Sequence, residues 1–149
     1  MDLNFAFDHL QIDDATAVFP LPWLSPKAKL ICRPAVEANR PFYEALLRTS
    51  GARQRASLTT VTTLKVDPEN SRQDRREDRN IYPGLVVVGW EGITNRQGQE
   101  VEFSVDACGS FLRALPDWIF DRLRLFAMRP DNFVREAAPL PDAATLVGN

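Results

Sequence analysis

The apolar positions in the C-terminal third of the chain recur with the spacing of an amphipathic helix. Ser104 is a suitable N-cap, and Asp106 would face the positive end of the helix dipole. The apolar residues that follow lie at i, i+3, i+4 and i+7, namely Cys108, Phe111, Leu112 and Leu115. This pattern predicts a first short helix.

A second short helix is expected between Pro116, which suits a helix start, and Pro130, which ends it. Its apolar stripe consists of Ile119, Leu123 and Phe126, with Trp118 and Leu125 beside it and Arg122, Arg124 and Arg129 on the other side. Two short helices with a tight joint predict a C-terminal helical hairpin.

A third amphipathic pattern begins after Asn39, a plausible cap, with Pro41 in the first turn. Phe42, Ala45 and Leu46 form its stripe, Tyr43 and Leu47 widen it, and Gly51 suits its end. An ordinary core-facing helix is favoured over a helix presented to a partner, because any globular helix needs one apolar stripe.

The N-terminal residues 1–36 are rich in proline and alternate only over short stretches. Residues 28–33 alternate moderately and stop at Pro34, which predicts a short strand. Residues 1–36 are therefore expected to form a proline-rich arm with one or more short strands. A mostly helical domain would follow over 37–136, and residues 137–149, with Pro139, Pro141 and Gly148, would form a flexible tail.

Two central segments allow more than one interpretation. Residues 56–66 are β-branched, which favours a strand, and they also lie where a linker could lie. Residues 84–92 are either the first strand of a hairpin or a buried helix that ends near Trp90. Periodicity cannot decide between strand and helix in runs this short.

The most polar stretch, residues 67–82, contains arginines and acids in equal number between Glu69 and Arg79. Alternating signs at short spacing predict a solvated helix with weak ion pairs along it. Nucleic-acid contact is disfavoured as a primary role, because the charges cancel and a phosphate-binding surface would be basic.

The residues that carry catalysis or bind cofactors are sparse. The net charge is −2, and His9 is the one histidine. No nucleophile elbow, phosphate loop, dinucleotide fingerprint or C-x-x-C pair is present. The carboxylate pairs Asp13–Asp14 and Glu77–Asp78 lie in polar stretches, where ionised surface acids are the usual case. We therefore predict no enzyme, no cofactor and no metal site.

The remaining sequence features bear on the cellular compartment in which the protein works. Cys32 and Cys108 are expected to be buried thiols rather than a disulfide. No apolar run is long enough to span a bilayer, and the N-terminus lacks the features of a signal peptide. We predict no membrane partner.

Three blocks of sequence resemble a known family. The first comprises residues 30–34 (LICRP), 39–43 (NRPFY) and 45–48 (ALLR), and the second is residues 88–104 (VGWEGITNRQGQEVEFS). The third comprises residues 112–118 (LRALPDW) and 129–133 (RPDNF). Together they resemble the tail assembly chaperones of long-tailed bacteriophages, although Asn95 stands where those proteins usually have an acid.

The resemblance implies a mostly helical protein of the host cytoplasm that binds the tape measure protein, keeps its apolar helices soluble and helps to recruit tail tube subunits. It supplies no binding residue, so the partner-binding residues remain unknown. With the patterns above, the expected fold is mainly α with a small N-terminal β element (α+β) and a C-terminal helical hairpin. Trp90, Phe103, Trp118 and Phe126 would be core residues.

A virion structural protein is the alternative: a capsid decoration, head–tail joining or tail subunit that binds neighbouring virion subunits. The proline-rich segment 13–36 favours this interpretation, since it could lie along a neighbour. A small hydrolase or nuclease is a third hypothesis and would need a site built from scattered acids. The oligomeric state and the existence of a frameshifted longer product stay open.

Overall fold

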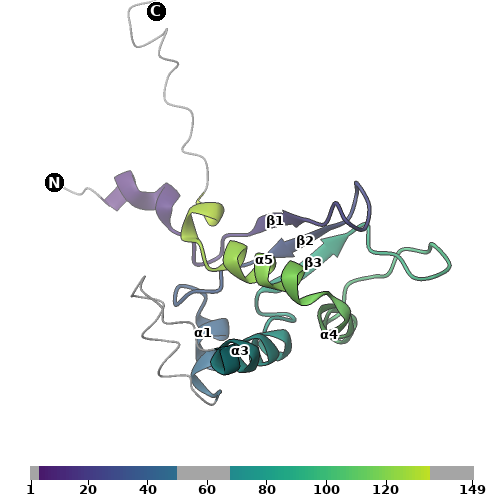
Figure 1. The fold of residues 1–149 in the computed structure, drawn as a ribbon. Helices are drawn as coiled ribbons and strands as arrows, with labels where there is room; N and C mark the ends of the chain where they lie inside the picture. The colour runs from purple at the N-terminus through teal and green to yellow at the C-terminus, as the bar shows by residue number, and fades with distance from the viewer. Residues whose placement is uncertain (1–3, 50–67, 135–149) are drawn as a thin grey trace, which may run out of the picture.

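A three-stranded antiparallel sheet forms one layer of the protein, and the helices form the other. The structure, a computed structural model, describes residues 4–49 and 68–134 (Figure 1). The strands are β1 (Ala17–Pro20), β2 (Lys29–Cys32) and β3 (Val87–Glu91), in the order β1-β2-β3. The helices are α1 (Arg40–Leu47), α3 (Pro68–Ile81), α4 (Val105–Ala114) and α5 (Asp117–Ala127). Two 3-10 helices flank them, η1 (Asn4–Leu10) and η2 (Pro130–Phe133).

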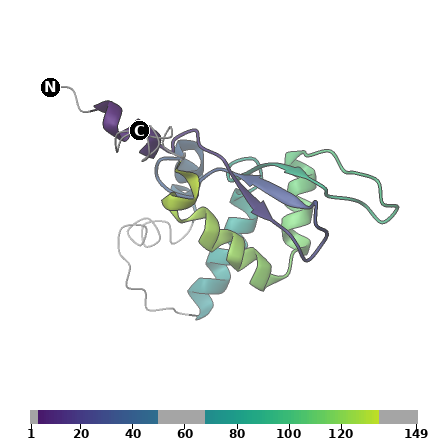
Figure 2. The same cartoon turned by 90° about the horizontal axis from the view of Figure 1, so that it is seen from above.

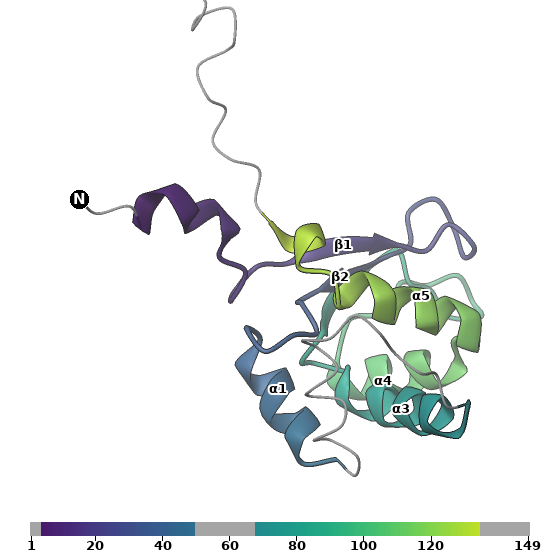
Figure 3. The same ribbon diagram turned by 60° about the vertical axis from the view of Figure 1, so that its left-hand side comes forward.

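The strand register separates a covered face of the sheet from an open one. Leu30 lies opposite Phe19 on β1 and Trp90 on β3, and all three are buried. Since side chains alternate along a strand, their neighbours Val18 and Ile31 face the other way, and Val18 is exposed. The helices lie on one side of the sheet (Figure 3).

The two layers share one aromatic core. Tyr82, just after α3, is fully buried between Phe42 of α1 and Phe120 of α5, at ring-centroid distances of 6.0 and 5.5 Å. Buried Asn39 caps α1 and donates from Nδ2 to the carbonyls of Pro34 and Leu85 at 2.9 and 2.8 Å. This amide therefore ties α1 to the segment before β3, and the predicted cap is confirmed.

The expectation of a β element confined to the N-terminus is wrong, because the third strand comes from the middle of the chain. Residues 84–92, which the sequence left open between helix and strand, contain β3. Gly84 at φ +81° turns the chain after Tyr82, whose carbonyl accepts from the Val86 and Val87 amides. The turn places β3 against β2, so the fold is α+β with a central sheet. Residues 56–66 and the expected tail, residues 137–149, lie outside the described residues.

The expected helical hairpin is also corrected. Leu115 and Pro116 between α4 and α5 both have extended backbone (ψ 131° and 144°), and the two helices cross steeply instead of running antiparallel (Figures 1 and 2). Of the four expected core aromatics, Trp90 is buried, and Phe103 and Phe126 pack against the core. Trp118 is exposed, because it lies on the outer face of α5.

Both cysteines are free and buried, as expected. Among the described residues, no helix has the length and apolar character needed to cross a membrane.

Candidate protein-binding surface

A tight turn after β1 presents Trp23 to solvent. Leu21 and Ala28, both buried, close the turn with a hydrogen bond of 2.8 Å from the Leu21 amide to the Ala28 carbonyl. The amide of Leu24 also donates to the Leu21 carbonyl at 3.0 Å. These hydrogen bonds fix both ends of the turn. Trp23 and Leu24 lie between the ends, outside the core, with 44% and 56% of their surface exposed.

The outer face of α5 contributes the second half of this surface. Trp118, Arg122 and Leu125 lie at i, i+4 and i+7, so they share one stripe of the helix. All three are exposed, and Trp118 keeps 51% of its surface in solvent. The opposite stripe, made of Ile119, Phe120, Leu123 and Ala127, is buried.

Trp23 and Trp118 meet edge to face, with ring centroids 5.3 Å apart and an interplanar angle of 84°. The Arg122 guanidinium lies 5.8 Å from the Trp23 ring and 5.4 Å from the Trp118 ring. Edge-to-face and cation–π contacts each contribute about 1 kcal/mol at exposed sites. We call these three residues, with Leu24 and Leu125, the Trp23–Trp118 surface.

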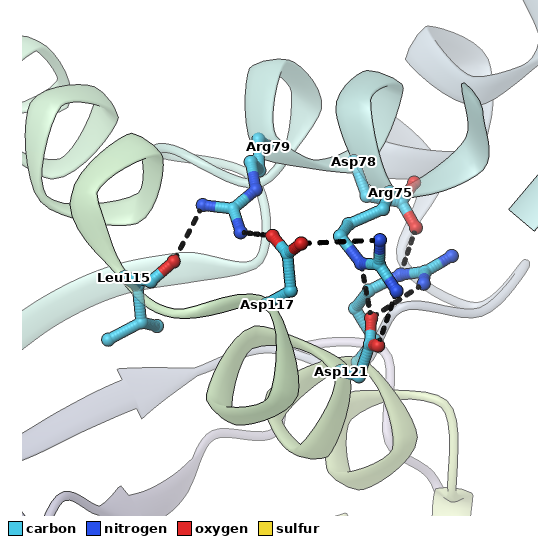
Figure 4. Close-up of polar contacts among 7 residues, drawn as sticks. Arg75, Asp78, Arg79, Leu115, Asp117 and Asp121 are labelled. Atoms are coloured by element: carbon cyan, nitrogen blue, oxygen red, sulfur yellow. Dashed lines mark hydrogen bonds and ion pairs between the residues drawn. The ribbon is translucent and has the colours of Figure 1, made fainter. Parts of the chain in front are cut away.

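Ion pairs from α3 hold α5 in place (Figure 4). Arg75 donates from Nε and Nη2 to the two carboxylate oxygens of Asp121, at 2.9 and 2.7 Å. Arg79 donates to Asp117 at 2.6 Å and also binds the carbonyls of Leu112 and Leu115 at the end of α4. Because forked Arg–carboxylate pairs define orientation as well as distance, α3 fixes both α5 and the corner before it.

A further ion pair between α3 and α5 is buried. Asp78 of α3, with 3% of its side chain exposed, accepts from Nε of Arg124 at 2.8 Å. Arg124 also donates to Asp121 at 3.2 Å. The hydrogen bond from Arg75 lowers the pKa of the Asp121 carboxyl, and Arg124 lowers it further, against an opposing effect of burial. Asp121 is therefore ionised at neutral pH and accepts from both arginines.

These contacts extend one sequence expectation and correct another. Residues 67–82 contain the predicted polar helix, α3, and its Arg75, Asp78 and Arg79 bind partners on α5. Arg124 was expected on the solvent side and lies largely buried. A signal was present in the sequence, because Arg75 and Arg79 share the four-residue spacing of Asp117 and Asp121.

A separate feature, a groove, lies beside β3. This groove of about 570 Å³ is lined by Trp90, Glu91, Gly92, Ile93, Glu100, Val101, Glu102 and Phe103. Its apolar lining belongs to the core, and its three glutamates are exposed. No set of three or more His, Cys, Asp or Glu residues in the described ranges could hold a metal ion.

Of the other residues singled out in the sequence, Asp13 and Asp14 are exposed at a turn after η1. His9 is half-buried in η1, and Glu77 is half-buried on α3 beside Asp78. The structure does not bring these residues into one site. The aromatic surface was missed because Trp118 was expected in the core.

A comparison with known families finds that the YdaY prophage protein family matches residues 39–139. The matched stretch includes α1 and continues beyond η2, and it therefore contains both α3 and α5. No curated protein matches the chain, and no solved structure matches it either.

Proposed function

Since this chain belongs to the YdaY prophage protein family and is thus a phage-associated protein, we propose that it acts as a tail assembly chaperone. In this role it binds the tape measure protein and tail tube subunits during tail morphogenesis, in the host cytoplasm and without catalysis. The proposal combines membership of a prophage family with the resemblance of the three sequence blocks to such chaperones.

The Trp23–Trp118 surface is the observation that carries this proposal. Trp and Arg dominate the binding energy of protein interfaces, and this surface presents two tryptophans and Arg122 together. An amphipathic helix docks through an apolar stripe, and Leu24 and Leu125 extend the apolar area available to it. The ion pairs from α3 hold α5 rigid before binding, which reduces the entropy lost on association.

Co-expression with the tape measure protein of the same prophage tests the proposal. We expect the tape measure protein to be soluble and to co-purify with the chain, and to become insoluble when the chain carries Trp23→Ala and Trp118→Ala. Truncation of a tryptophan that is a hot spot of an interface costs about 2 kcal/mol or more, on the order of thirtyfold in affinity.

Leu47→Ser is the matched control, because Leu47 is an exposed apolar residue on α1. Its co-purification should equal that of the natural chain. A tape measure protein that stays equally insoluble with and without the natural chain would contradict the proposal.

A virion structural protein remains the second candidate, and η1 is the observation that favours it. This short helix stands away from the body of the protein and exposes Phe7 and Leu10, as an arm that lies along a neighbour would (Figures 1 and 3). Mass spectrometry of purified particles from the induced prophage distinguishes the two roles. Stoichiometric peptides of this chain in the particles would favour the structural role, whereas their absence would favour the chaperone.

A further inference from the structure

The N-terminal helix η1 is an arm whose two large apolar side chains are largely exposed in the part of the chain that the structure describes. Phe7 and Leu10 expose 55% and 45% of their surfaces, whereas Ile12, two residues after Leu10, is buried in the core. Ile12 therefore anchors the arm, and η1, on the N-terminal side of Ile12, projects away from the body of the protein (Figures 1 and 3). Two large apolar side chains exposed on one short element offer an apolar contact to a partner.

The charge of this arm is opposite to that of the outer face of α5. Residues 4–14 contain no lysine or arginine and three aspartates, two of which, Asp13 and Asp14, are exposed at the root of the arm. Arg122 and Arg129, seven residues apart on or just after α5, are both exposed. The apolar side chains of such an arm are suited to pack against Trp23 and Trp118, and its carboxylates are suited to pair with the guanidinium groups of Arg122 and Arg129.

We propose that η1 of one copy of this chain docks on the Trp23–Trp118 surface of a second copy. In this contact Phe7 and Leu10 pack against the tryptophans, and the acidic arm lies beside Arg122 and Arg129. The arm covers the surface when no phage partner is bound, so the inference goes beyond the proposed function.

The position of the arm favours a second copy over the same chain. η1 lies at the end of the molecule where α5 passes into η2, and Trp118 is in the first turn of α5, at the other end (Figures 1 and 3). Eleven residues of α-helix separate these ends by about 16 Å. Because Ile12 fixes the root of the arm, η1 projects away from the tryptophans of its own chain.

Such a contact is heterologous, since each copy gives an arm and receives another. A contact of this kind closes into a ring when the rotation between copies allows it, and otherwise continues as a filament. The expected assembly of the natural chain is thus larger than a dimer when the protein is concentrated.

Light scattering coupled to size-exclusion chromatography tests this inference on the full chain. An arm variant carries Phe7→Ser and Leu10→Ser, and a surface variant carries Trp118→Ala and Arg122→Glu. We expect the natural chain to exceed the mass of a dimer as its concentration rises. Each variant alone should stay at the 16.8 kDa monomer or associate at least about tenfold more weakly.

An equimolar mixture of the two variants is the decisive sample. The surface variant still has its arm and the arm variant still has its surface, so one productive contact forms and no further one can follow. The mixture should therefore stop at a one-to-one dimer. Raised salt should weaken this dimer, because charge contributes to the contact.

Two controls accompany these samples. Leu47→Ser should assemble like the natural chain, and a cooperative thermal unfolding transition in both variants would show that they fold. A natural chain that stays monomeric at several hundred micromolar, or variants that assemble normally, would overturn the inference. A mixture of the two variants that stays monomeric, under conditions in which the natural chain assembles, would also overturn it. These samples contain no phage partner, so failure here leaves the chaperone proposal to its own test.

Discussion

At the scale of single residues, Trp90 joins two segments that the sequence places apart. Its indole Nε1 donates to the Val101 carbonyl at 2.8 Å. Its ring meets Phe103 and Phe111 edge to face, at centroid distances of 5.2 and 5.5 Å. The side chain therefore links β3 to α4 and to the extended segment that precedes it.

Trp90→Ala should lower the free energy of unfolding by roughly 3–5 kcal/mol, because it leaves a cavity and an unpaired carbonyl. Trp90→Phe should cost less, since it removes the indole N–H and keeps most of the ring packing. Denaturant unfolding measures both losses. A thermal midpoint unchanged by Trp90→Ala would show that this packing is not part of the folded state.

Gly92 is required where the chain passes close to the turn that carries Trp23. Its φ is +71°, and a Cβ there would lie 2.5 Å from the Lys27 carbonyl oxygen. Gly98, at φ +76°, has no atom within 4 Å of the same position. Both Gly→Ala variants incur the cost of a left-handed backbone, roughly 1–2 kcal/mol, and only Gly92→Ala adds the clash. Thermal unfolding should show a clearly larger loss for Gly92→Ala, and equal losses would contradict this account.

At the scale of elements, α3 acts as a brace between α4 and α5. Its arginines bind the acids of α5 and the last carbonyls of α4, and its buried Asp78 binds Arg124. The polar composition of this helix therefore serves contacts between helices. Its effect on function, in our proposal, is to keep the outer face of α5 in position for a partner.

Asp78→Ala should destabilise the protein by about 3 kcal/mol, because it removes the buried partner of Arg124. Glu77→Ala, one residue earlier on α3, should cost much less. Replacing both members of the pair by leucine should recover part of the loss, since apolar groups need no partner. Denaturant unfolding of these variants measures the differences, and similar losses for Asp78→Ala and Glu77→Ala would show that the pair adds little.

The pH dependence of stability should carry a contribution from Asp121. Its pKa is lowered in the folded state by the hydrogen bond from Arg75, so its contribution is present above the unfolded value of about 4. This contribution is lost as the pH falls through the folded pKa. The stability of the natural chain should thus fall more steeply below pH 4 than that of Asp121→Asn.

At the scale of the whole molecule, one core joins residues far apart in the chain. Cys32 of β2 and Cys108 of α4 both belong to it, and each is fully buried. Burial raises the pKa of both thiols to about 12, and the charge of Cys108 adds to the effect on Cys32. Their reactivity therefore reports whether the core is closed.

Neither thiol should react with iodoacetamide at pH 8 in the folded protein, because the thiolate is the reacting form. Both should react once denaturant opens the core, and mass spectrometry counts the alkylated sites. A Ser110→Cys variant supplies an exposed thiol on α4 that should react at once. Rapid alkylation of Cys32 or Cys108 without denaturant would contradict a closed core.

The sequence by itself determined the helices with strong apolar stripes and their caps. Ser104 accepts from the Ala107 amide at 3.0 Å, and α4 buries Cys108 and Leu112 from its predicted stripe. These features depend on neighbours three or four residues away, which a linear pattern contains. The short strand over residues 28–33 was predicted for the same kind of reason, and it is β2.

Tertiary structure alone decided how residues far apart in the chain come together. The valine run before Trp90 became a strand because β2 was there to pair with it, and a run that short has no period of its own. Trp118 and Arg124 lie on different faces of α5, and the sequence pattern assigned each of them to the wrong side. Asp78 attracts Arg124 into the core, and Trp23 holds Trp118 at the surface. Which face of a helix is buried thus depends on partners that lie tens of residues away in the chain, and a local sequence pattern carries no information about those partners.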